Sequence, residues 1–166
     1  LHFYAQMMRS VGQYERAAQL FCRAAEVRPE DYQALAIASN MYDAIGDIQR
    51  SLEVSKETTE RAKRAIELNP NDSRALILGA GAWHTLGDEE RAMEWADRAL
   101  EINPSSSSVM YNSACLYARS GKTERALDFL EKAVDFGGRN KRYYENDIDF
   151  ASIRDHPRFK ALLERV

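Results

Sequence analysis

Residues 73–104 read SRALILGAGAWHTLGDEERAMEWADRALEINP and contain two helical patterns separated by a glycine. Leu76 and Trp83 lie at i and i+7, on one apolar face of a first helix. Gly87 follows, and glycine readily takes the left-handed conformation that ends a helix. Asp88 is placed to cap a second helix, which ends before the closing proline. The stretch therefore predicts a pair of antiparallel helices.

The same spacing recurs along the chain. Turn glycines separated by 34, 41 and 34 residues are Gly12, Gly46, Gly87 and Gly121. Prolines that end the second helices, separated by 41 and 34 residues, are Pro29, Pro70 and Pro104. A large residue stands four places before each turn glycine: Met8, Tyr42, Trp83 and Tyr117. A small residue stands three places earlier, which allows close helix crossings. The chain is therefore built from repeats of one helix pair.

This period, the glycine turn, the alanine-rich second helix and the endings LNP (68–70) and INP (102–104) resemble the tetratricopeptide-repeat (TPR) family. The resemblance covers roughly residues 1–138. It implies an all-α fold, a right-handed α-solenoid of about four helix-turn-helix repeats with a C-terminal capping helix. Because this scaffold serves many unrelated partners, the resemblance implies protein binding without naming a partner.

The predicted repeats span residues 1–31, 32–72, 73–106 and 107–138, and residues 139–166 form a cap. The second repeat has seven additional residues, without glycine or proline, in its second helix. Seven residues make about two helical turns, so the pattern predicts one continuous helix of about 22 residues. We expect the added residues 55–61 to be polar and solvated; a partner contact on this overhang stays an open alternative.

The cap is predicted to cover the last repeat with apolar side chains, because a solenoid needs a distinct end. Its expected covering residues are Ile148, Phe150, Ile153, Phe159, Leu162 and Leu163. Residues 146–163, NDIDFASIRDHPRFKALL, also resemble the ends of C-terminal TPR regions in bacterial signalling and regulatory proteins. Gly138 is expected to end the last repeat, and the serines at 105–108 to cap the helix that follows them.

The first helix begins at the fourth place of a repeat and is apolar over more than one face. This pattern favours a fragment of a longer polypeptide whose other residues pack here. A frayed start is the alternative.

Composition excludes several classes of function. The chain has 166 residues and a net charge of −3, so no general attraction to nucleic acid or anionic membranes is expected. No run of 18 apolar residues is present, so no direct membrane contact is predicted. Cys22 and Cys115 belong to different repeats, which favours reduced thiols and a cytoplasmic location over a disulfide.

Residues for catalysis are not grouped in the sequence. His2, His84 and His156 lie in three different elements, without metal-ligand spacing. Gly79 and Gly81 lie inside a helix, where they favour close packing rather than a phosphate loop. We therefore expect no enzyme activity, no cofactor and no metal.

The first helices of the repeats are expected to line a concave groove. Its predicted peptide-binding residues are Gln6, Arg9, Gln33, Asn40, Asp43, Arg74, Ile77, His84, Tyr111, Asn112 and Arg119. Three arginines against one aspartate favour a peptide or helix with acidic groups. TPR proteins that bind the acidic C-termini of chaperones carry lysine in the groove; none stands here, so that function is not predicted.

The basic residues Arg139, Lys141 and Arg142 are expected to pair with the acidic residues Glu145, Asp147 and Asp149, with a nucleic-acid contact as the alternative.

Two functions remain. The leading one is a protein-interaction scaffold, as a regulatory module of a larger signalling protein. The alternative is a structural segment that forms a homodimer through its N-terminal helix.

Overall fold

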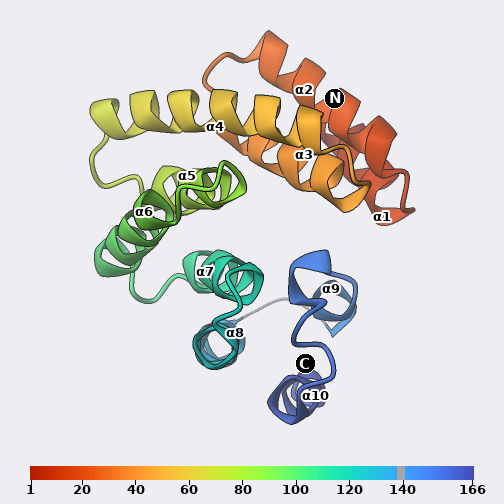
Figure 1. Ribbon diagram of the computed structural model, residues 1–166, viewed down its shortest axis with the longest axis vertical. Helices are drawn as coiled ribbons and strands as arrows, with labels where there is room; N and C mark the ends of the chain where they lie inside the picture. Colours follow the sequence, from red (N-terminus) through yellow and green to blue (C-terminus); the bar gives the residue numbers. More distant parts are fainter. Residues whose placement is uncertain (138–140) are drawn as a thin grey trace. The chain divides into compact units, whose positions relative to one another are not determined.

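The computed structural model describes residues 1–137 and 141–166, and every regular element in these ranges is helical (Figure 1). The elements are α1 (His2–Ser10), α2 (Tyr14–Val27), α3 (Tyr32–Ala44), α4 (Ile48–Leu68), α5 (Ser73–Thr85), α6 (Glu89–Ile102), α7 (Ser107–Arg119), α8 (Thr123–Asp135), α9 (Lys141–Glu145), the 3-10 helix η1 (Ile148–Phe150) and α10 (Pro157–Leu163). The predicted all-α fold of helical repeats is confirmed.

The first helix of each repeat ends in the same hydrogen-bonded turn. After α5, the N–H of Asp88 donates to the carbonyl oxygen of Trp83 at 3.0 Å. Between them Gly87 has φ of 83°, a conformation that side chains with a Cβ rarely adopt. The equivalent bond after α7 joins Lys122 to Tyr117 at 2.8 Å. The fixed spacing between large residue and glycine in the sequence is thus the spacing of one capping motif.

The helix starts are capped by short acidic or hydroxyl side chains. Asp88 accepts a hydrogen bond from the N–H of Arg91 at 3.0 Å, as its place after the glycine predicts. Ser106 accepts from Val109 at the start of α7, so the predicted serine cap is confirmed. Asp31, Asp47 and Asp72 cap α3, α4 and α5 in the same way.

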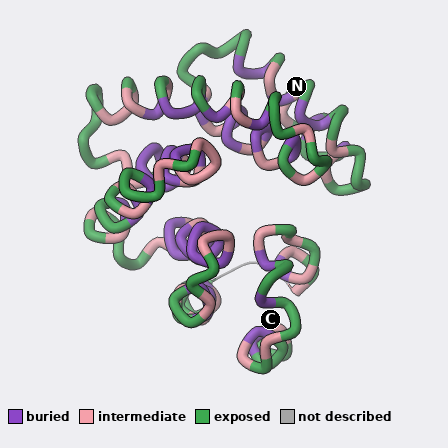
Figure 2. Tube along the Cα trace, in the orientation of Figure 1, coloured by how far each residue is buried: buried purple, intermediate pink, exposed green. Residues whose placement is uncertain are grey.

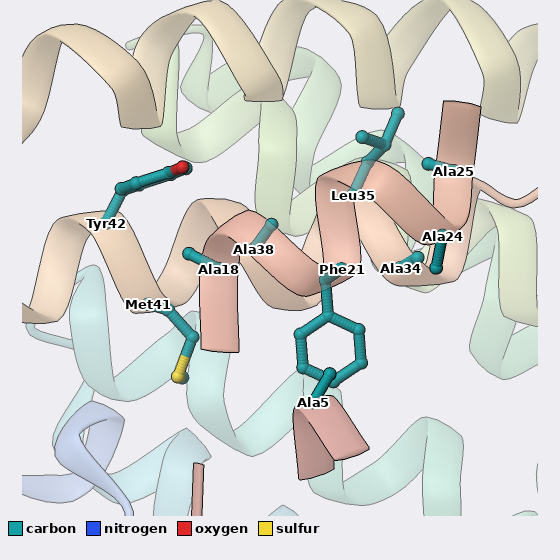
Figure 3. Packing of buried hydrophobic residues seen from close by; sticks show 10 residues of the cluster. All are labelled: Ala5, Ala18, Phe21, Ala24, Ala25, Ala34, Leu35, Ala38, Met41 and Tyr42. Carbon is teal, nitrogen blue, oxygen red and sulfur yellow. The ribbon is translucent and has the colours of Figure 1, made fainter. Parts of the chain in front are cut away.

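The helices form two compact units, Leu1–Asp97 and Arg98–Val166. In the first unit, α2 packs against both α1 and α3. Phe21 of α2 is fully buried and points toward Ala5 of α1 (Figure 3). Ala18 and Ala25 of α2 belong to the same cluster as Ala38 of α3. Small side chains at these crossings let the backbones approach closely.

Of the two helical glycines, only Gly79 is needed for packing. A Cβ added at Gly79 would lie 2.7 Å from Cε3 of Trp95, which is too close for van der Waals contact. A Cβ added at Gly81 would meet nothing within 4 Å. The prediction of close packing is confirmed for Gly79 and wrong for Gly81, because the two residues lie on different sides of α5.

The long helix α4 agrees with one prediction and partly contradicts another. It is continuous over 21 residues, as expected from the seven added positions. The added turns are solvated on one side only: Lys56, Glu57 and Glu60 are exposed. Ser55, Thr58 and Thr59 are buried, and buried positions recur along the helix (Figure 2). Ser55 bonds to the Ser39 hydroxyl at 2.6 Å, and Thr58 donates to the Val54 carbonyl oxygen at 2.8 Å. Small polar side chains can be buried here because their hydroxyl groups are satisfied.

In the second unit, α7 packs against α8 and η1, and α10 packs against α8 and α9. The predicted covering residues Phe150, Ile153, Phe159 and Leu162 are buried, and Leu163 is partly buried. Ile148 is 48% exposed, so its predicted role is wrong. Gly138, the predicted end of the last repeat, lies outside the described residues, and the repeat boundaries stay a prediction.

Candidate functional site

The first helices of the first unit are joined at their N-terminal ends. His2 of α1 contacts the Asp31 carboxylate, the cap of α3, at 2.6 Å. The hydroxyl of Tyr32 in α3 donates to the Asp72 carboxylate, the cap of α5, at 3.1 Å. Burial and the adjacent Asp72 carboxylate raise the pKa of Tyr32 to about 12. The N-termini of α1, α3 and α5 are therefore held next to one another.

Because these helices start together, residues at equivalent repeat positions are expected to form one surface. Gln6, Asp43 and Arg74 are exposed on it. Partly buried members are Arg9, Gln33, Asn40 and His84. Ile77 is only 3% exposed, so it offers almost no surface to a ligand. We call the seven accessible residues the first-helix surface.

His84 has a structural partner across the glycine turn. Its Nδ1 lies 2.8 Å from the carboxylate of Glu89, in the first turn of α6. The adjacent Asp88 instead caps α6, as predicted. His84 therefore contributes to the α5–α6 turn as well as to the first-helix surface.

Tyr111, a predicted binding residue of α7, is covered by the chain itself. It is 4% exposed, and its hydroxyl donates a hydrogen bond to Asp147. Its ring centroid lies 5.3 Å from that of Tyr143, 5.6 Å from that of Tyr144 and 5.5 Å from that of Phe150. Burial and nearby negative groups raise the pKa of Tyr111 far above its ordinary value. This side chain is a core residue of the second unit.

Arg119 is covered by the same segment. Its Nε lies 3.9 Å from the Asp149 carboxylate, and both side chains are largely buried. Asn112 donates to the Ser108 carbonyl oxygen at 2.7 Å within α7. The expectation that Tyr111 and Arg119 are open to a partner is therefore wrong. Residues 141–150 occupy their face and supply the carboxylates that the sequence assigned to a ligand.

The same cluster brings together three potential metal ligands. One ligand atom each of Cys115, Asp147 and Asp149 lies within 4.8 Å of the other two. Burial, followed by the charges of Asp149 and Asp147, raises the pKa of the Cys115 thiol well above its ordinary value. A protonated thiol is a poor metal ligand, and the two carboxylates already contact Tyr111 and Arg119. The group therefore fits a hydrogen-bonded cluster better than a metal site.

The sequence could not reveal this cluster, since more than 30 residues separate Cys115 from Asp147. The predicted pairing of the basic run is wrong for Lys141. Lys141 contacts Glu164 at 3.1 Å, whereas Asp149 contacts Arg119. Arg139 lies outside the described residues.

The similarity of this chain to known families lies in the same repeats. Family profiles described as tetratricopeptide repeat match residues 60–107 and 95–128. These matches include the helix pairs with the glycine turn and the small-residue crossings described above. Residues 60–128 of this chain are tetratricopeptide repeats. TPR proteins are protein-interaction scaffolds, and this chain shares that general role.

No curated protein sequence is a significant match to this TPR chain. Among solved structures, YrrB, described as a TPR protein with an unusual peptide-binding site, is 21% identical; the match covers 82% of this chain and 84% of YrrB, with a TM-score of 0.42. MamA is 19% identical over 97% of this chain and 93% of MamA, with a TM-score of 0.44. MamA 41-end from Desulfovibrio magneticus RS-1 is 17% identical over 98% of this chain and 86% of its own, with a TM-score of 0.45.

Within residues 1–137 and 141–166, no helix combines the length and the apolar character needed to cross a membrane.

Proposed function

We propose that this TPR protein is a non-catalytic scaffold that binds an extended peptide or a helix with acidic groups on the first-helix surface. The observation that carries the proposal is the pair of contacts His2–Asp31 and Tyr32–Asp72. They hold the N-terminal ends of α1, α3 and α5 together. A chain running across the three helices would therefore meet polar side chains from each of them in turn.

The charge of the surface supports an acidic ligand. Arg9 and Arg74 contribute two positive charges, and Asp43 contributes one negative charge. Arg74 is exposed at the start of α5. A guanidinium group can bind a carboxylate through two parallel hydrogen bonds, which gives orientation as well as affinity. The amide side chains of Gln6, Gln33 and Asn40 can pair with a peptide backbone.

The covered face of α7 is not included in this proposal. A ligand there would have to displace residues 141–150. Within this segment Tyr144 and Phe150 are completely buried. Exposing an aromatic side chain of this size costs about 1.5–3 kcal/mol. A peptide that also had to break the Arg119–Asp149 pair would bind weakly. We therefore place the binding residues in α1, α3 and α5.

The test is an array of 12-residue peptides with varied net charge, incubated with the labelled protein. We expect the acidic peptides to be retained preferentially at low salt. The variant with Arg9→Glu and Arg74→Glu should lose at least tenfold in affinity for the best acidic peptide. A matched variant with Arg23→Glu and Arg64→Glu carries the same charge change at exposed positions of α2 and α4. Equal loss in both variants, or no preference for acidic peptides, would contradict the proposal.

The regulatory role and the cellular location of this protein are proposed from its sequence. We propose, from the C-terminal resemblance, that the chain is a regulatory module of a signalling protein, and that it works in the cytoplasm. Cys22 and Cys115 are free thiols, which fits a reducing compartment.

Self-association through α1 is the competing proposal, since Phe3 and Met7 are exposed. A concentration-dependent dimer in analytical ultracentrifugation would favour it.

A further inference from the structure

Gly81 lies beside the first-helix surface, at a place where the fold has no need of glycine. Arg74 precedes it by seven residues, about two turns of α5, so the two lie on the same side of the helix. Gly81 is partly buried, yet a Cβ added there would meet none of the described atoms within 4 Å. Its φ is not positive either. Since glycine inside a helix is destabilising relative to alanine, Gly81 leaves an opening on this surface at the expense of stability.

The second unit shows what rests on the equivalent position. Gly81 stands six residues before the turn glycine of its repeat, and Cys115 of α7 stands six before its own. The Cys115 Sγ and one carboxylate oxygen each of Asp147 and Asp149 lie within 4.8 Å of one another. Ile148, between the two acids, is 48% exposed, so the carboxylates face α7 and the residue between them does not. Two acidic residues separated by one other residue therefore cross a first helix at this position.

The groups that hold the two carboxylates differ between α7 and α5. On α7 they are the Tyr111 hydroxyl and the Arg119 guanidinium. On α5 the exposed Arg74 lies on the side of Gly81, and its guanidinium can bind a carboxylate through two hydrogen bonds. The helix α5 thus has both room for an acidic segment and a cation for it.

We infer that Gly81 is the place where the ligand crosses α5, and that this ligand carries two acidic residues separated by one residue, an assignment that rests on the proposed function. The main chain of the ligand lies against Gly81, and one of its carboxylates pairs with Arg74. A side chain at position 81 would occupy the space of the ligand.

The spacing is tested with 12-residue peptides of serine and glycine that carry two aspartates, either adjacent or separated by one, two or three residues. In fluorescence polarisation, we expect the peptide with one intervening residue to bind at least about threefold more tightly than the others. The peptide with asparagines at the same two places should not bind. Equal affinity for all four spacings would overturn the inferred spacing.

Variants of Gly81 test the contact itself. Gly81→Leu should lower the affinity for the best of these peptides at least about tenfold, and Gly81→Ala about threefold. Gly81→Ala should leave the Tm unchanged or raise it, so its weaker binding would not come from unfolding. The control Gln19→Leu, at an exposed position of α2, should leave the affinity within about twofold.

Two outcomes separate this contact from the proposed function. Unchanged affinity in Gly81→Leu, together with a loss in the variant with Arg9→Glu and Arg74→Glu, would overturn the role of Gly81 and leave the acidic ligand in place. If none of the acidic peptides binds the unchanged protein, the role of Gly81 and the proposed function are both wrong.

Discussion

Arg61 of α4 donates a hydrogen bond from Nη1 to the carbonyl oxygen of Ala25 in α2, with 2.8 Å between the atoms. The same nitrogen lies 3.2 Å from the carbonyl oxygen of Arg28. The last carbonyl groups of a helix lack partners within it, and a cation there also interacts favourably with the helix dipole. The seven residues added to α4 therefore carry a side chain to the end of α2, and join the first two repeats.

Replacing Arg61 should destabilise the first unit. The side chain is only 12% exposed, and it also contacts Glu57 at 2.5 Å. We expect Arg61→Met to lower the free energy of unfolding by about 1.5–3 kcal/mol, because a charged donor to the carbonyl groups at the end of α2 is lost. Urea denaturation followed by circular dichroism measures the change. Arg64→Met, at an exposed place one turn on, is the control, and equal midpoints for the two variants would refute this role.

The two glycines of α5 should respond oppositely to alanine. Gly79→Ala places a Cβ against Trp95, and such overpacking costs about 1–3 kcal/mol. Gly81→Ala meets open space and gains helix propensity, so it should stabilise by up to about 1 kcal/mol. Thermal unfolding of both variants decides the matter. If both changes stabilise the protein, the contact between Gly79 and Trp95 is not tight.

The cap of α3 should make stability depend on pH below neutrality. Burial alone would raise the pKa of Asp31, but hydrogen bonds from the Ala34 N–H and His2, with the charges of His2 and Arg28, lower it overall. A lowered pKa in the folded state gives stability that is present above the unfolded pKa, about 3.9, and is lost as pH falls through the folded value. We expect Asp31→Asn, which keeps a capping oxygen, to lose less stability between pH 5 and 3 than the unchanged protein.

Removing His2 should change the pH dependence in the same direction as Asp31→Asn. In His2→Gln the Asp31 carboxylate loses a charged partner, so its pKa should move up toward the ordinary value. Because the folded and unfolded pKa values then differ less, the urea midpoint of His2→Gln should fall less between pH 5 and 3 than that of the unchanged protein. Urea midpoints at half-unit steps of pH would show this, and superimposable pH profiles for His2→Gln and the unchanged protein would exclude the coupling.

Arg158 should hold the last helix on the second unit. From α10 it contacts Glu124, Asp128 and Glu131 of α8 at 2.6, 2.8 and 3.0 Å. These hydrogen-bonded carboxylates raise the pKa of Arg158 above its ordinary value. Because the network is partly exposed, we expect Arg158→Met to cost only about 1 kcal/mol.

The measurement for Arg158 is amide hydrogen exchange in α10, which should become about fivefold faster in Arg158→Met. Lys160→Met removes the neighbouring pair with the fully exposed Asp155 and serves as control. Exchange that accelerates equally in both variants, or in neither, would show that the network does not fix α10.

The periodic features were predictable because they depend on neighbours in the sequence. The glycine turns, the Asp88 and Ser106 caps and the continuity of α4 each involve residues within a few positions of one another. Burial in the added turns of α4 was not predictable from polarity. Ser55 is buried because it meets Ser39, 16 residues away, and a satisfied hydroxyl no longer resists burial.

The predicted binding residues also fall into a group that follows from repeat spacing and a group whose pairing only the tertiary structure shows. Its members on α1, α3 and α5 follow from repeat spacing, and they stay a prediction that the peptide array tests. That the predicted binding residues of α7 are covered by the chain itself does not follow from repeat spacing. Tyr111 and Arg119 stand at binding positions of the repeat, yet Asp147 and Asp149 of the same chain already pair with them.

The sequence alone determined that this protein is a series of helix pairs, since hydrophobic period, glycine and cap are local properties. The tertiary structure decided which surfaces remain open. A side chain's exposure depends on what distant segments bring to it: residues 141–150 cover α7, and α2 and α4 cover α3 and α5. Leu1 and Leu35 occupy the same place in their repeats, but Leu1 is 53% exposed and Leu35, on the helix against which α2 packs, is 3% exposed.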